Sequence, residues 1–130
     1  MVRHERAFGP VRPGSVVLMN SDWAQCAGDP DAFKNTDGSG TYHFPGFSAD
    51  AAEFLVDKRR VRGIGVDTLS IDAGAVGGFP VHHRILGADL FALENLANLD
   101  RIPASGSQIF VGVVPYEQGS GSPCRVIARY

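Results

Sequence analysis

The sequence has no long hydrophobic run. None of its apolar stretches approaches the roughly 20 residues that a helix needs to cross a bilayer. The N-terminal residues also contain no apolar signal segment. We therefore expect neither a membrane-spanning helix nor secretion, and we place the protein in the cytoplasm.

Cysteine and excess positive charge are also scarce. The only cysteines, Cys26 and Cys124, lie far apart and match no metal or disulfide motif, so we predict free thiols. The net charge is −2, and no basic stripe is interleaved with aromatic residues, which argues against a nucleic-acid partner. The one dense basic run, residues 58–62, is interpreted as a solvated helix end, where cations interact favourably with the helix dipole.

The composition that is left is typical of a globular domain. The chain has 130 residues, of which 44% are hydrophobic and 20% are charged. A chain of this length can bury a core without disulfides or structural metals. The sequence therefore predicts a single domain over residues 1–130, with residues 1–12 flexible because they are polar and have no apolar partner of their own.

The order of apolar segments and turn residues predicts an α/β protein with few helices. A helix is predicted over residues 49–59, with Ser48 as its N-cap, and residues 28–47 are predicted to form a long loop. A helix between two strands favours a βαβ unit with those strands parallel and side by side. The predicted strands cover residues 15–19, 62–67, 90–93, 108–114 and 124–129, and shorter helical turns are expected at 22–26, 82–86 and 97–101.

Residues 79–96 carry the main functional signal. His82 and Glu94 are twelve residues apart, and the apolar run 90–93 leads directly into the carboxylate. We expect Glu94 at the end of a buried strand, where an unpaired charge would be costly. An imidazole and a carboxylate brought together by the intervening turn would suit a divalent metal. The alternative for His82 is a hydrogen-bonded histidine at the start of a helix.

Six segments of the chain occur in an order that resembles a known family. They are PGSVVL (13–18), FPGFS (44–48), GIGVDTLSID (63–72), FPVH (79–82), ENLANL (94–99) and GSPCRVIA (121–128). Together they resemble the cyclase family of metal-dependent hydrolases, which includes kynurenine formamidases and isatin hydrolases. The resemblance implies a swivelling β/β/α fold with a mixed sheet, truncated here at its N-terminal side. It also implies hydrolysis of cyclic or N-formyl amide and lactone bonds.

The resemblance also assigns two metal ligands. His82 and Glu94 fall on ligand positions of the family, which implies a divalent metal, zinc or manganese. The family's upstream motif, His-x-Gly-Thr-His-x-Asp-x-Pro-x-His, has no counterpart in this sequence. A catalytic metal usually has three protein ligands. We therefore expect weak or absent metal binding and impaired hydrolysis from this chain by itself, and no catalytic residue is assigned.

Other candidates carry weaker signals. Trp23 and His43 are candidates for substrate binding. The alternative for Trp23 is packing in the core, and the alternative for His43 is a place in a surface loop without contact to substrate. His83 is expected to be exposed and His4 unstructured. Asp67 and Asp72 follow a strand and are interpreted as residues that shape the next turn by hydrogen bonding. A serine nucleophile is not indicated, because no serine has the strand-turn-helix context of a nucleophile elbow.

The missing motif leaves the biological role open. Three histories would explain the gap: a fragment of a longer protein, one half of a split enzyme, or a degenerate relative. The alternative function is a non-catalytic binding or assembly module that needs a partner chain. Missing strands would expose sheet edges and apolar surface, so we expect a homodimer or a higher homo-oligomer. The small-molecule partner implied by the resemblance is an amide or a lactone, and neither nucleic acid nor membrane is expected to bind.

Overall fold

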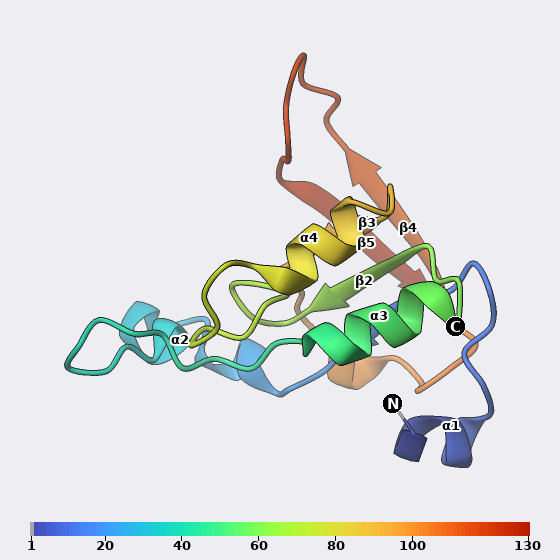
Figure 1. The fold of residues 1–130 in the computed structure, drawn as a ribbon, viewed down its shortest axis with the longest axis horizontal. Coiled ribbons are helices and arrows are strands. Elements are labelled where there is room, and N and C mark those ends of the chain that lie inside the picture. The colour runs from blue at the N-terminus through green and yellow to red at the C-terminus, as the bar shows by residue number, and fades with distance from the viewer. Residues whose placement is uncertain (1) are drawn as a thin grey trace. The chain divides into compact units, whose positions relative to one another are not determined.

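The computed structural model describes residues 2–130 (Figure 1). The described chain gathers into two compact units, residues 2–99 and residues 100–130. That the chain is one domain stays a prediction. Each unit is described by itself. None of the helices in residues 2–130 has the length and apolar character of a bilayer-spanning segment.

A three-stranded parallel sheet organises the first unit. Its strands are β1 (Val16–Met19), β2 (Gly63–Val66) and β3 (Phe91–Leu93), in the order β1-β2-β3. The parallel pairing of β1 with β2, predicted from the sequence, is confirmed. Helix α3 (Ala49–Asp57) lies between β1 and β2 in the chain, and helix α4 (Pro80–Leu86) lies between β2 and β3. The predicted N-cap is also confirmed, since the Ser48 hydroxyl accepts a hydrogen bond from the amide of Ala51 at 3.2 Å.

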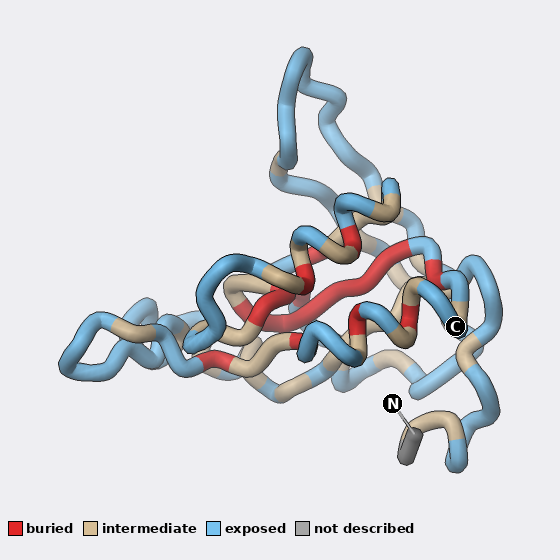
Figure 2. Tube along the Cα trace, in the orientation of Figure 1, coloured by how far each residue is buried: buried red, intermediate tan, exposed pale blue. Residues whose placement is uncertain are grey.

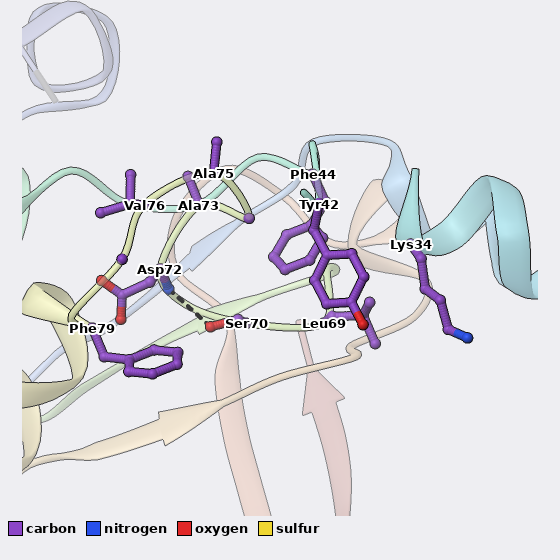
Figure 3. Close-up of a pocket in the computed structure, with 12 residues that line it drawn as sticks. Lys34, Tyr42, Phe44, Leu69, Ser70, Asp72, Ala73, Ala75, Val76 and Phe79 are labelled. Atoms are coloured by element: carbon purple, nitrogen blue, oxygen red, sulfur yellow. Dashed lines mark hydrogen bonds between the residues drawn. The ribbon is translucent and has the colours of Figure 1, made fainter. Parts of the chain in front are cut away.

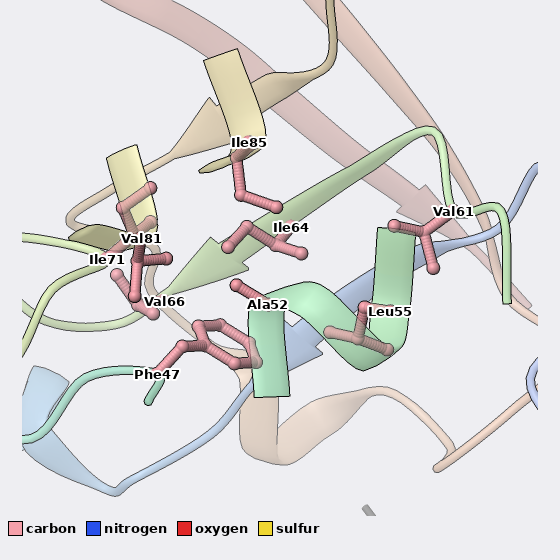
Figure 4. Packing of buried hydrophobic residues seen from close by; sticks show 9 residues of the cluster. All are labelled: Phe47, Ala52, Leu55, Val61, Ile64, Val66, Ile71, Val81 and Ile85. Atoms are coloured by element: carbon pink, nitrogen blue, oxygen red, sulfur yellow. The ribbon is translucent and has the colours of Figure 1, made fainter. Parts of the chain in front are cut away.

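The core lies between β2 and the two helices. Every residue of β2 is buried (Figure 2), and the buried run continues through Asp67 and Thr68. Ile64 of β2 packs in one cluster with Leu55 of α3 and Ile85 of α4 (Figure 4). The intervening Gly65 accommodates neighbouring side chains, because a Cβ there would lie 2.7 Å from Cδ2 of Leu18. Alternate glycine and branched residues therefore let a short strand be buried on both faces.

An N-terminal helix, α1 (Val2–Phe8), lies where the sequence predicted a flexible segment. The Glu5 carboxylate accepts hydrogen bonds from Arg59, at 2.5 Å from Nε and 2.7 Å from Nη2. Arg59 also lies over the Phe54 ring, with its guanidinium carbon 4.4 Å from the centroid. His4, predicted to be unstructured, lies on this helix with its ring centroid 5.0 Å from that of Phe8. The basic run is thus not a purely solvated helix end, since Arg59 tethers α1.

The predicted loop over residues 28–47 contains a short helix, α2 (Pro30–Lys34), which the sequence analysis missed. Its N-cap is Asp29, whose carboxylate accepts hydrogen bonds from the amides of Asp31 and Ala32. The helix follows from a local signal, a capping aspartate followed by proline at the first helical position. A 3₁₀ turn, η1 (Trp23–Cys26), precedes it, where a helical turn was predicted.

The second unit is built on an antiparallel pair of strands, β4 (Gln108–Val113) and β5 (Cys124–Arg129). A 3₁₀ turn, η2 (Leu99–Arg101), precedes the pair. Phe110 lies opposite Ile127 in the ladder, and both side chains are exposed. The predicted α/β class with few helices is confirmed. Parallel and antiparallel pairing, however, are divided between two sheets in the described chain.

Candidate functional site

His82 and Glu94 come together beside the carboxyl ends of neighbouring strands. Glu94 directly follows β3, and His82 lies in the first turn of α4. His82 Nε2 lies 3.2 Å from Glu94 Oε1, and the two side chains are 29% and 32% exposed. The same Glu94 oxygen accepts a hydrogen bond from the amide of Ile71 at 3.1 Å. The expectation of a buried carboxylate was wrong, because solvent reaches Glu94 at the sheet edge. The strand end is nevertheless where ligands of parallel sheets bind.

A buried carboxylate, Asp72, fixes His82 from the other side. Asp72 Oδ2 lies 2.7 Å from Nδ1 of the His82 ring and 3.1 Å from its amide nitrogen. Its Oδ1 accepts a hydrogen bond from the amide of Val81 at 2.8 Å. Only 2% of Asp72 is exposed. The sequence predicts only a turn-shaping role for Asp72; the structure adds that it caps α4 and orients the imidazole. No local sequence pattern predicts this role, because Asp72 and His82 are ten positions apart and irregular turns connect them.

The other strand-end aspartate, Asp67, has a different task. Its carboxylate accepts hydrogen bonds from the amide and hydroxyl of Ser21 and from the amide of Trp23. Asp67 is 1% exposed, so these donors replace water around a buried charge. Asp67 therefore anchors the segment that follows β1 to the segment that follows β2.

The arrangement of the His82, Asp72 and Glu94 side chains favours binding of a cation. Asp72 has only acceptor oxygens, so a proton on Nδ1 of His82 satisfies both partners. In that tautomer Nε2 presents a lone pair to Glu94, and two acceptors at 3.2 Å need a proton or a metal ion to reconcile them. A histidine oriented by a carboxylate is the usual setting of a metal-ligating imidazole.

The side chains of His82 and Glu94 are suited to form part of a metal centre. Imidazole nitrogen and carboxylate oxygen are ligands that both zinc and manganese accept. Within residues 2–130, however, no group of three or more His, Cys, Asp and Glu side chains is arranged to hold a metal ion. His82 and Glu94 can therefore supply two ligands, and a complete catalytic set needs donors from elsewhere.

The two candidates for substrate binding, Trp23 and His43, make local hydrogen bonds. Trp23 Nε1 donates a hydrogen bond to the carbonyl of Phe33 at 2.8 Å. His43 is exposed, and its Nε2 lies 2.8 Å from Oδ2 of Asp37. This hydrogen bond is the largest of the effects that hold the pKa of Asp37 well below its usual range. Substrate contact by Trp23 or His43 stays a prediction. His83 is exposed, as expected.

A cavity of about 570 Å³ adjoins the site (Figure 3). It shares Asp72 with the hydrogen-bonded group described above, and Phe79 of its wall contacts His82. No sequence pattern predicts its aromatic side chains, Tyr42, Phe44 and Phe79, because they come from segments that are distant in sequence. The lining residues are Lys34, Tyr42, Phe44, Leu69, Ser70, Asp72, Ala73, Gly74, Ala75, Val76, Gly77 and Phe79.

Comparison with known proteins gives consistent matches. The model of the family described as "Putative cyclase" matches residues 1–73. An isatin hydrolase of Roseibium aggregatum is 40% identical over 128 residues, which cover 95% of this chain and 48% of that protein. Isatin hydrolase A of Ralstonia solanacearum superposes with a TM-score of 0.93 at 37% identity, covering 98% of this chain and 49% of that one.

A second solved structure extends the match. An isatin hydrolase bound to the product analogue thioisatinate gives a TM-score of 0.92 at 37% identity. The predicted cyclase-like fold is thereby confirmed. The chain spans about half the length of each of these relatives, 48% of one and 49% of the other two.

Proposed function

This chain belongs to the cyclase family, and on that premise we propose that it provides half of the centre of a metal-dependent hydrolase. In this proposal His82 and Glu94 are two ligands of a divalent ion, zinc or manganese. The substrate is a cyclic or N-formyl amide or a lactone, and isatin, a cyclic amide, is the first compound to test because the relatives are isatin hydrolases. The observation that carries the proposal is the 3.2 Å approach of Nε2 to Glu94, with Nδ1 held by Asp72 at 2.7 Å.

The residues of this chain have distinct roles in that chemistry. A bound divalent ion would lower the pKa of a water molecule and polarise the substrate carbonyl. Asp72 retains the proton on Nδ1 and keeps Nε2 free as a donor atom. Glu94 supplies negative charge, and its hydrogen bond from the Ile71 amide limits its rotation. The neighbouring cavity offers an apolar surface against which the rest of a substrate can pack.

The remaining ligands come, in this proposal, from outside residues 2–130: from a further segment of the same protein, from a second polypeptide or from a second copy of the chain. Support comes from the two-ligand set in the described residues and from the half-length match to the relatives. A split or oligomeric enzyme would assemble its full ligand set at an interface. The free thiols of Cys26 and Cys124 are in keeping with the cytoplasmic location expected from the sequence.

Metal titration tests the proposal directly. Isothermal calorimetry with Zn²⁺ and Mn²⁺ should detect weak binding to the wild-type chain. His82→Ala and Glu94→Gln should each weaken that binding by at least about tenfold, since each removes one of two ligands. His83→Ala is the matched control, because His83 is adjacent in sequence but exposed. Equal affinity in all four proteins would reject the assignment of the ligands.

Complementation tests the incomplete centre. The segment of the Roseibium isatin hydrolase that this chain does not match should be co-expressed with this chain, and isatin consumption should be followed by absorbance. We expect hydrolysis from the mixture, little from either part alone, and none when the mixture carries His82→Ala. Full activity of this chain alone would show that no further ligands are needed.

The second candidate function is a non-catalytic binding or assembly module. It is favoured by one observation, the absence in residues 2–130 of a third metal-binding side chain beside His82 and Glu94. On this alternative, a stable assembly would form without metal and would be insensitive to His82→Ala. The titration above separates the two functions, because a module of this kind has no reason to bind Zn²⁺ through these residues.

A further inference from the structure

Phe79 has an unfavourable backbone and little compensating burial. Its φ and ψ are 49° and 50°, in the left-handed region that glycine adopts freely and other residues avoid. Its side chain is 59% exposed, so hydrophobic burial offsets only part of the strain. Strain of this kind clusters at functional sites.

The position does not need phenylalanine for the helix. Phe79 is the N-cap of α4 and makes no side-chain capping bond. Asp72 replaces that function by accepting from the amides of Val81 and His82. Glycine at position 79 would therefore satisfy the backbone at lower cost, and the aromatic ring calls for another explanation.

The ring contacts the imidazole that the metal proposal uses. The Phe79 and His82 rings meet edge to face, with centroids 5.8 Å apart and an interplanar angle of 85°. Such T-shaped contacts are favourable and depend on orientation. Asp72 fixes Nδ1, and the Phe79 ring restricts rotation of the imidazole at a second point. Figure 3 shows Phe79 and Asp72 on the same side of the cavity.

We propose that Phe79 is a positioning residue, whose ring holds the His82 imidazole so that Nε2 stays directed at Glu94. The inference rests on the proposed function, because it assigns a partner to the same histidine. One part of it does not depend on metal binding: the strained backbone of Phe79 is tolerated because it places the Phe79 ring against the His82 imidazole.

Two measurements on Phe79→Gly test this role. The variant should release backbone strain and raise the melting temperature by about 3 °C. In the metal-free protein, ¹³C relaxation of the His82 ring should show larger-amplitude motion than in the wild type. Zn²⁺ affinity should fall by about tenfold, which is the smaller of the losses usually seen when a residue that orients a metal ligand is removed. Phe79→Tyr keeps the ring and should restore both ring order and Zn²⁺ affinity.

Arg60→Gly is the matched control for strain. Arg60 has a φ of 51° and is exposed, and it follows α3 by three residues. Its backbone hydrogen bonds go to Val56 and Gly14. Its replacement should also raise the melting temperature but leave His82 ring motion and Zn²⁺ affinity unchanged.

Two results would overturn the inference. One is unchanged His82 ring motion in Phe79→Gly, and the other is a fall in melting temperature, as expected for an ordinary packing residue. If the wild-type chain binds no Zn²⁺, the proposed function fails, but the relaxation measurement still decides the role of Phe79.

Discussion

At the scale of single residues, the site depends on how His82 is held. Asp72 binds one ring nitrogen and the helix amides, and Glu94 faces the other ring nitrogen. Asp72 reaches this position because the segment around it pairs with the segment around Phe47, through a parallel bridge and the hydrogen bond from the Phe47 amide to the Ile71 carbonyl at 2.8 Å. The geometry of the imidazole is therefore set by backbone packing outside the site.

Gly46 provides a test of that packing. A Cβ at position 46 would lie 2.3 Å from the Ala73 amide nitrogen and 2.4 Å from the Asp72 carbonyl carbon. Both are backbone atoms that cannot turn aside, so Gly46→Ala should destabilise the protein by about 3 kcal/mol and displace Asp72. Urea denaturation measures the loss. Gly77→Ala is the control, because a Cβ there meets nothing within 4 Å, and it should change stability by less than about 0.5 kcal/mol.

At the scale of elements, helix α1 is joined by a charged contact to the segment that directly follows α3. Glu5 accepts two hydrogen bonds from Arg59 and a third from the amide of Val11. The hydrogen bond from Arg59 is the main cause that lowers the pKa of Glu5 from 4.5 to about 2. The folded protein thus binds this proton less readily than the unfolded chain does.

The pH dependence follows from the sign of that shift. A lowered folded-state pKa means that Glu5 contributes stability above pH 4.5, and that this contribution is lost as the pH falls from 4.5 toward about 2. The stability difference between wild type and Glu5→Gln, from urea denaturation, should be largest near neutral pH and should shrink below pH 4.5. Glu53→Gln, an exposed change on α3, should show no such trend. A difference between wild type and Glu5→Gln that is constant from pH 7 to pH 3 would contradict the assignment.

At the scale of the whole molecule, each unit leaves surface that is suited to association. In the first unit, β1 and β3 are the edge strands of the described sheet. In the second unit, the cross-strand pair Phe110 and Ile127 is 50% and 57% exposed. Exposed strand edges and apolar pairs favour contact with another chain.

We therefore expect self-association in the absence of another partner. Size-exclusion chromatography with light scattering should give a mass above the 13.9 kDa of one chain at micromolar concentration. Phe110→Lys should shift the population toward monomer if the β4–β5 pair lies in the interface, whereas Lys58→Met, on the exposed end of α3, should not. A clean monomer in the wild type would reject the expectation.

Local signals predicted most elements but not all of them. The strands β1, β2 and β4 stand out as apolar runs, and α3 has a capping serine before its apolar stripe. Helix α2 was missed because only five residues and a capping aspartate mark it. Helix α1 was missed because its anchor, Arg59, lies 54 positions further along the chain.

The sequence by itself determined the family and the parallel pairing of β1 with β2, because both depend on the types and order of residues along the chain. It also singled out His82 and Glu94, whose role as metal ligands stays a prediction. Only the tertiary structure decided that these two side chains lie 3.2 Å apart in partial contact with solvent. It alone also showed that Asp72 lies within hydrogen-bond distance of the imidazole and that the Phe79 ring contacts it. Such contacts depend on where a bend and a helix start place their side chains in space, and those positions arise from packing of the whole unit rather than from spacing along the chain.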